Sequence, residues 1–391
     1  MAESLNIKDI ATVLNSIVNQ ATGKSAIAAI TAGDFSSVAT TALIDGYDPV
    51  LGAISQVVGK TIISSRPYTG RFSELVADSE RWGYITRKIV PGVLTAETNG
   101  EYTLTDGSHS PDMFDVRKRP MKQFNFYGAD TFAYHETYYE NQLDSAFHSL
   151  EEFRAFVGGM RQAFENDRAV MLETLARDTL TSFVAGIIST NNSSQIRHLL
   201  TEYNAVSGGS YTATTIFYPA AFPDFIKWFQ GLIMTESALM ESRSVLRHQS
   251  VTGFDVYRHT PKAQQRVYMP TSYKNALATE VYSSVFNEQF LRQVDFREID
   301  FWQSAQSPLS INVTPTILQA AGTTAAAGSA VSNSIVFGVL MDKDAVGVTL
   351  RNESMRTAPF EVAGGYSNVW YKGTRQHWMD YTENAVVFML D

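Results

Sequence analysis

The feature that most constrains this chain is a long run of helical periodicity that begins near Ser149 and continues to about Ile187. Apolar side chains recur there at three- and four-residue spacing, which is typical of one buried face of an α-helix: Phe153, Val157, Met160, Phe164, Met171 and Leu175. Ser149 and Glu152 have the spacing of a capping box, in which side chains satisfy the free amides of the first turn. A helix of about 35 residues measures roughly 50 Å, about three times the average, so the fold has to be built along it.

Two adjacent glycines, Gly158 and Gly159, lie inside this predicted helix. Glycine is about 1 kcal/mol less favourable than alanine in a helix interior. Their presence therefore predicts either the close approach of another backbone or a bend in the helix.

The stretch from Trp82 to Tyr139 has a strand-like pattern. Strands are predicted at Tyr84 to Val90, Glu101 to Leu104 and Phe124 to Tyr134, and turn signals such as Asn99-Gly100 separate them. This predicts a long β-hairpin with a polar tip. Because an isolated two-stranded ribbon is marginally stable in water, the hairpin needs another surface to lie on.

A cationic cluster follows the predicted hairpin tip and consists of Arg117, Lys118, Arg119 and Lys122. Such a cluster is most often a solvated surface. It could instead contact an acidic patch on a neighbouring subunit, because the net charge of −9 leaves such patches plentiful. Contact with DNA is a third interpretation, for which four charges in a net-negative chain are a weak signal.

The N-terminal segment from Ser4 to Gln20 predicts an amphipathic helix, with one apolar stripe formed by Ile7, Ile10, Leu14 and Ile17. This stripe could pack on the core of its own chain, or it could belong to an arm that docks on a neighbouring subunit or a scaffold. The periodicity is the same in both cases, so both interpretations stay open.

The second half of the chain mixes helices and strands, which predicts the α+β class. Pro223 and Asp224 open a helix. Short strands are predicted at Gly253 to Arg258 and Arg266 to Met269. Three apolar strands close the chain, at Ile335 to Met341, Val369 to Trp378 and Ala385 to Leu390.

Chemical signatures of catalysis are missing from the sequence. It has no phosphate-binding GxxxxGK[ST] loop, no HExxH zinc helix and no GxSxG nucleophile turn. The seven histidines are scattered and there is no cysteine, so no metal or cofactor site is predicted. The paired acids Glu151-Glu152, and Asp342 with Asp344, are interpreted as surface charge rather than an acid/base pair. We therefore predict that the chain is not an enzyme.

Composition favours assembly with other chains and not insertion into a membrane. Charged residues make up 18%, below the roughly 25% of ordinary soluble proteins, and aromatic residues make up 12%. Much of the surface is therefore expected to be buried against partners. No apolar run approaches the roughly 20 residues that span a bilayer, and the start lacks a secretory signal, which predicts a chain that is soluble and intracellular at synthesis.

Two segments resemble the major capsid protein family of tailed phages, particularly short-tailed phages of Gram-positive hosts. One begins with DPVLGAISQVVGKTIISSRPYTGRF (Asp48 to Phe72) and continues with NFYGADTFAYHETYYENQLDSAFHSLEEFRAFV (Asn125 to Val157) into the long helix. The other is GVLMDKDAVGVTL (Gly338 to Leu350), followed by GGYSNVWYKGTRQHWMDYTENAVVFMLD to the end of the chain. These are packing patterns, so they specify a fold better than an activity.

The resemblance implies the Hong Kong-type phage coat fold, an α+β fold with an N-terminal arm, an extended β-hairpin loop, a long spine helix, a peripheral β-sheet and an axial domain. Residues 1–81 would be the arm, 82–139 the extended loop, 140–214 the peripheral domain with the spine helix, 215–365 the axial domain, and 366–391 strands that return to the peripheral domain. No motif marks the residues that cross-link some relatives.

The function implied is that of a major capsid protein, which self-assembles as pentamers and hexamers into the icosahedral shell of a virion. The shell would enclose double-stranded DNA without sequence-specific binding, and its partners would be a separate scaffolding protein and a portal protein. An encapsulin-type nanocompartment shell and, less favoured, a carbohydrate-active enzyme are the alternatives. Residue-level contacts between subunits are hypotheses, placed on the cationic cluster and on the N-terminal apolar stripe.

Overall fold

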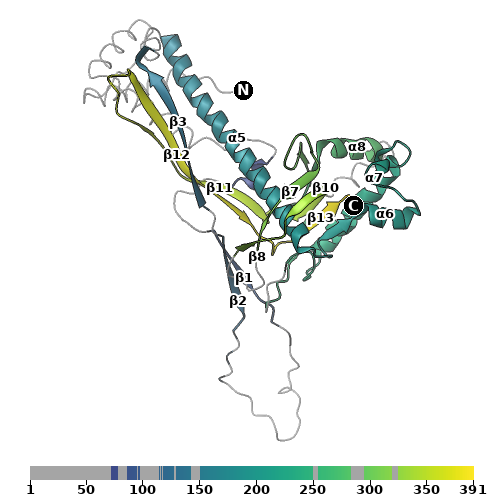
Figure 1. Cartoon of the computed structure of the whole chain (residues 1–391). Helices are drawn as coiled ribbons and strands as arrows, with labels where there is room; N and C mark the ends of the chain where they lie inside the picture. The colour runs from purple at the N-terminus through teal and green to yellow at the C-terminus, as the bar shows by residue number, and fades with distance from the viewer. Residues whose placement is uncertain are drawn as a thin grey trace. The chain divides into compact units, whose positions relative to one another are not determined.

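The computed structural model describes residues 72–77, 86–94, 96, 114, 116, 118–126, 129–141, 150–249, 254–282, 295–318 and 325–391 (Figure 1). The N-terminal stripe of Ile7, Ile10, Leu14 and Ile17 lies outside these residues, as does Arg117. The chain forms two compact units, each made of stretches that are far apart in sequence. The first unit contains 1–84, 128–176 and 348–377, and the second contains 85–127, 177–347 and 378–391.

The predicted long helix is confirmed as α5 (Leu150–Thr190), which has 41 residues and measures about 62 Å. Residues up to Ala176 belong to the first unit and the remainder to the second. A Cβ atom placed on Gly159 would meet no atom within 4 Å. The close backbone approach that the glycine pair suggested is therefore absent at Gly159. Ser149, the first residue of the predicted capping box, lies outside the described residues.

The first unit contains a three-stranded sheet in the order β11 (Val346–Thr357), β12 (Tyr366–Met379), β3 (Ala129–Tyr139). Before it, η1 (Ser73–Leu75) leads to a parallel bridge between Val76 and Val348. The sheet packs on α5 through aromatic side chains, and the rings of Phe164 and Tyr371 lie 6.1 Å apart. Beside them the buried guanidinium of Arg168 donates to Glu353 at 2.8 Å.

The second unit is built on a six-stranded sheet in the order β4-β13-β10-β5-β6, with β7 also pairing with β10. Its strands are β4 (Ile196–His198), β5 (Gln265–Pro270), β6 (Asp295–Ile299), β7 (Ser310–Val313), β10 (Val331–Asp342) and β13 (Ala385–Met389). A separate small hairpin pairs β8 (Thr316–Leu318) with β9 (Ala325–Ala327). The helices are α6 (Leu199–Ser207), α7 (Phe222–Glu241) and α8 (Thr271–Tyr282), with short turns η3 (Thr215–Phe217) and η4 (Lys262–Gln264).

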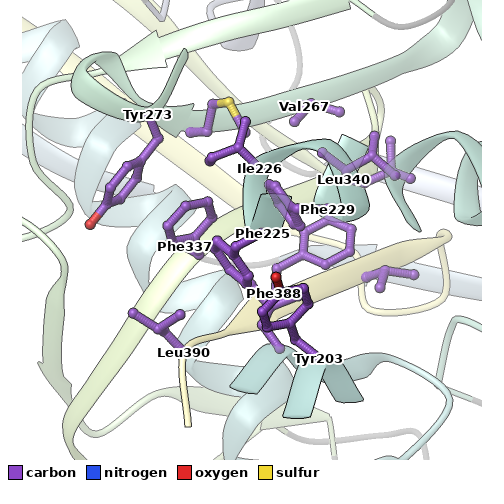
Figure 2. Packing of buried hydrophobic residues seen from close by; sticks show 14 of the residues in the cluster. Tyr203, Phe225, Ile226, Phe229, Val267, Tyr273, Phe337, Leu340, Phe388 and Leu390 are labelled. Carbon is purple, nitrogen blue, oxygen red and sulfur yellow. The ribbon is translucent and has the colours of Figure 1, made fainter. Parts of the chain in front are cut away.

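The core of the second unit is aromatic and centres on Phe337 of β10 (Figure 2). Its ring stacks on Tyr273 with centroids 4.0 Å apart and meets the edge of Phe229 at 4.9 Å. Phe225, Phe229 and Ile233 repeat every four residues along α7, so one face of that helix is buried on the sheet. The helix starts where the sequence predicted, with Pro223 and Asp224 in its first turn.

Two strand predictions needed correction, and one strand was missed. The single strand predicted from Phe124 to Tyr134 is two strands in different sheets, β2 (Met121–Phe126) and β3. The predicted strand from Gly253 to Arg258 forms only isolated bridges, such as Arg258 with Ser244. Strand β11 was not predicted at all. The three closing strands are confirmed as β10, β12 and β13, and the mixture of helix and sheet confirms the α+β class.

Candidate functional site: the β1–β2 ribbon

A two-stranded antiparallel ribbon in the second unit is the candidate site. Strand β1 (Thr86–Pro91) pairs with β2, and the register places Lys88 opposite Phe124 and Val90 opposite Lys122. Because side chains alternate along a strand, these four residues share one face, which we call the inner face. Ile89 and Met121 belong to the opposite, outer face.

The inner face attaches the ribbon to the second unit through a small apolar contact. Val90 and Phe124 are buried against Val256, with Phe126 and Phe254 partly buried around them. At the end of β1, the amide of Gly92 donates to the carbonyl of Pro120 at 2.7 Å. A Cβ atom at this glycine would lie 2.7 Å from Cγ of Pro120, so a larger residue would separate the two strands.

An ion cluster completes the inner face. The Nζ atom of Lys88 lies 2.5 Å from Oδ2 of Asp380 and also donates to Glu383, while Arg258 lies 3.3 Å from Glu383. Burial by itself would lower the pKa of Lys88, but the two carboxylates raise it overall. Burial raises the pKa of Glu383, although both cations oppose that shift.

The outer face of the ribbon is open to solvent, and two large apolar side chains lie on it beside the polar side chains of Arg87, Gln123 and Asn125. Ile89 is 63% exposed and Met121 is 70% exposed. The side chains of Phe114 and Val116 are also exposed in the segment that leads to β2. Large apolar side chains gathered on an exposed surface mark sites of interaction with other macromolecules.

The structure describes three members of the predicted cationic cluster. Lys118 and Arg119 are exposed immediately before β2, whereas Lys122 is half-buried on the inner face. Within residues 86–94 and 118–126 all formal charges are positive. The ribbon therefore presents cationic groups beside the apolar side chains of Ile89 and Met121. The predicted hairpin did not reveal these two side chains, because the register that places them on the outer face was not predicted.

The described part of the chain shows no metal-binding cluster that would be an alternative candidate site. No group of three or more His, Asp or Glu side chains there could hold a metal ion. Asp342, which was interpreted from the sequence as surface charge, is instead buried and accepts hydrogen bonds from Thr260 Oγ1 and from the amide of Asp344, each at 2.9 Å, so it fixes a turn. Among the described helices, none is long and apolar enough to cross a membrane.

Comparison with solved structures shows the fold. The chain is similar to a chain of the capsid of Staphylococcus phage Andhra, with a TM-score of 0.53, 11% identity, and coverage of 84% of this chain and 86% of that one. It is also similar to a chain in the structure described as head fiber and inner core protein gp22 of native bacteriophage P68, with a TM-score of 0.50, 12% identity, and coverage of 82% and 85%. Comparison with curated protein sequences finds no match.

Comparison with family models shows the family. The model described as Phi29-like phage major capsid protein matches residues 14–389, which is nearly the whole chain. The resemblance to tailed-phage capsid proteins is thereby confirmed, and the comparisons give no support to the encapsulin-type shell or the carbohydrate-active enzyme. The chain belongs to the Phi29-like phage major capsid protein family and is a subunit that forms the icosahedral shell of the virion.

Proposed function

We propose that the shell is built by laying the β1–β2 ribbon of each subunit across an adjacent copy. The observation that carries this proposal is the exposed outer face, on which Ile89 and Met121 are more than half exposed. Fully burying one such side chain is worth about 1.5–3 kcal/mol. A ribbon that has only a small contact with its own unit gains the rest of its packing from the neighbour.

The cationic cluster supplies the electrostatic part of this contact. Arg117, Lys118, Arg119 and Lys122 contact an acidic patch of the adjacent copy, because the net charge of −9 leaves such patches plentiful. The N-terminal stripe of Ile7, Ile10, Leu14 and Ile17 is a second contact, formed by an arm that docks on a neighbour. Both assignments follow from sequence patterns.

The remaining roles follow from membership of the family. The subunit acts structurally and without catalysis, and it encloses double-stranded DNA without reading its sequence. It works with a separate scaffolding protein and a portal protein, in a phage of a Gram-positive host. The division into arm (1–81), extended loop (82–139), peripheral domain (140–214 and 366–391) and axial domain (215–365) is part of the same proposal.

The outer face can be tested by replacing its two apolar side chains together, as Ile89→Gln with Met121→Gln. We expect normal folding of the free subunit, because both side chains point into solvent, and a loss of shell yield of at least about tenfold, because two buried apolar contacts are removed from every interface. Electron microscopy and sedimentation measure the yield of shells.

Val206→Gln, at a residue of α6 that is 71% exposed, is the matched control. It removes an equally exposed apolar side chain from a different surface and should assemble better than the double variant. Normal yield from the double variant would exclude the outer face as an assembly contact.

A further inference from the structure

We propose that Lys88 is a latch: it holds the ribbon in one position against the second unit, and its release lets the ribbon take a second position as a rigid piece. This inference rests on the proposed function, because a ribbon that contacts a neighbouring subunit has to point in the direction of that neighbour. Subunits in pentamers and hexamers have different neighbours, so one fixed direction would not serve both.

The latch closes on a rigid part of the second unit. Asp380 and Glu383 lie on the turn between β12 and β13, and the amide of Asp380 donates to the carbonyl of Ala345 at 2.7 Å. The amide and hydroxyl of Thr382 donate to Oδ1 of Asp380 at 2.9 and 2.6 Å. These bonds orient the carboxylate, so its Oδ2 atom is presented to Lys88.

Apart from this lysine, few of the side chains that the structure describes hold the ribbon. The apolar cluster at its inner face has three buried members, Val90, Phe124 and Val256, whereas the core of the second unit has seventeen. A hydrogen bond to a charged group stabilises a folded protein about as much as burying one large apolar side chain does. Two such bonds from Lys88 are therefore a large share of the attachment.

The arrangement of charges makes release reversible. Arg258 contacts Glu383 and also donates to the carbonyl of Thr382 at 3.0 Å, and neither contact involves the ribbon. When Lys88 leaves, Arg258 continues to compensate Glu383. Among the described residues, Lys88 is the one cation paired with the carboxylate of Asp380, so that acid favours closure again.

Contact with a neighbouring subunit, and not a mild change of pH, opens the latch. A lysine whose pKa is raised in the folded chain stays charged at neutral pH, and its stabilising contribution is lost only as the pH rises through that raised value. The free energy that opens the latch comes from burying the outer face on the adjacent copy.

The absence of cysteine from the chain allows a direct test. One spin label is placed at Gln123→Cys, on the outer face of β2, and a second at Lys227→Cys, an exposed position of α7 in the same unit. Double electron–electron resonance on free subunits then gives the distribution of distances between ribbon and core. We expect Lys88→Met to increase the population of a second distance by about tenfold or more.

Two matched variants isolate the charge. Lys122→Met makes the same substitution on the inner face at a lysine without these carboxylate partners, and Lys88→Arg keeps the cation; both should keep the single distance of the original chain. A Lys88→Met distribution identical to that of Lys122→Met overturns the proposal. If Lys88→Met does not fold, Asp380→Asn with Glu383→Gln removes the carboxylates of the latch instead. A second distance in this variant supports the proposal, and a distribution identical to that of Lys122→Met overturns it.

The two proposals can fail separately. The distance measurement uses free subunits, so it does not depend on whether the ribbon contacts a neighbour. Shell yield of the Ile89→Gln, Met121→Gln variant tests that contact and does not involve Lys88. A second distance in Lys88→Met, together with a normal shell yield from the Ile89→Gln, Met121→Gln variant, would support the latch and exclude the proposed contact.

Discussion

Several buried charged residues in this chain maintain packing. Glu236 is 1% exposed, and its carboxylate accepts hydrogen bonds from Arg197 and Arg247 at 2.9 and 2.8 Å. Glu353 similarly accepts from Arg168 and Tyr371. Each carboxylate therefore has two donor side chains as partners. A buried charge that is fully paired in this way is retained because removing one partner would leave the other uncompensated.

His248 makes folding stability depend on pH. Burial lowers its pKa from the usual value of about 6.5, although hydrogen bonds to Val256 and Asn384 oppose the shift. The unfolded chain therefore binds this proton more tightly than the folded chain. The contribution to stability is complete above a pH of about 6.5 and is lost below it, at up to about 1.4 kcal/mol for each pH unit.

His248→Gln should flatten this dependence, because glutamine can still donate to the carbonyl of Val256 but cannot take up a proton. Urea unfolding of free subunits at pH 7.5, 6.5 and 5.5 measures the slope. Burial lowers the pKa of His377 as well, so part of the slope should remain. His259→Gln, at an exposed ring, is the control, and equal slopes for the two variants would contradict the assignment.

Elements differ in how much of their conformation is set locally. The periodicity that predicted α5 is a property of neighbouring residues, and the helix forms over nearly the predicted range. The ribbon is different, because its two strands are separated by some thirty residues and gain stability from a third segment around Val256. The sequence predicted a hairpin in this region, and β1 does pair with β2, but the register and the end of the second strand were not predicted.

Gly159→Ala should stabilise α5. The position is exposed, and a Cβ atom there would touch nothing within 4 Å, so only the helix propensity changes. We expect the free energy of unfolding of the free subunit to rise by about 0.5–1 kcal/mol, measured by urea unfolding. Gly338→Ala is the contrasting control, because its Cβ would lie 3.1 Å from the carbonyl oxygen of Tyr268 and should not stabilise.

A decrease in stability in Gly159→Ala would contradict this prediction. Increased stability together with a loss of shells would show that the glycine is kept for a contact between subunits.

The whole molecule combines sequence-distant segments into two units, and each unit takes residues from both ends of the described chain. It carries a net charge of −9, yet the ribbon carries only positive charges in its described strands and flanks. If the ribbon contacts an adjacent copy as proposed, this uneven distribution makes that contact attractive even though the copies repel each other on average.

Reversing the exposed cationic pair, as Lys118→Glu with Arg119→Glu, should weaken assembly. The loss of shells should be largest at low salt and shrink as the salt concentration rises to about 1 M, because salt screens exposed charges. Sedimentation at a series of salt concentrations measures the yield. Arg243→Glu with Lys227→Glu, at residues of the same unit outside the ribbon, is the control with the same change in net charge.

A yield that is unchanged at every salt concentration would exclude an electrostatic contact at this position. A uniform loss in both double variants would indicate that net charge alone matters.

The sequence by itself determined the elements with local signatures: the long helix, the start of α7 at Pro223, and the closing strands. It also determined the family, because packing patterns along most of the chain are shared with it. These features depend on residues a few positions apart, so periodicity and capping reveal them.

Only the tertiary structure decided what these elements pack against. The aromatic-rich composition from Phe124 to Tyr134 predicted one strand, and it could not show that β2 and β3 enter different sheets. Lys88 and Asp380 are 292 residues apart, and neither has a local signature. The side chains that attach the ribbon and fix its direction come together only when distant strands pair. The sequence could not predict this, because a periodic pattern indicates that a face is buried but not which segment covers it.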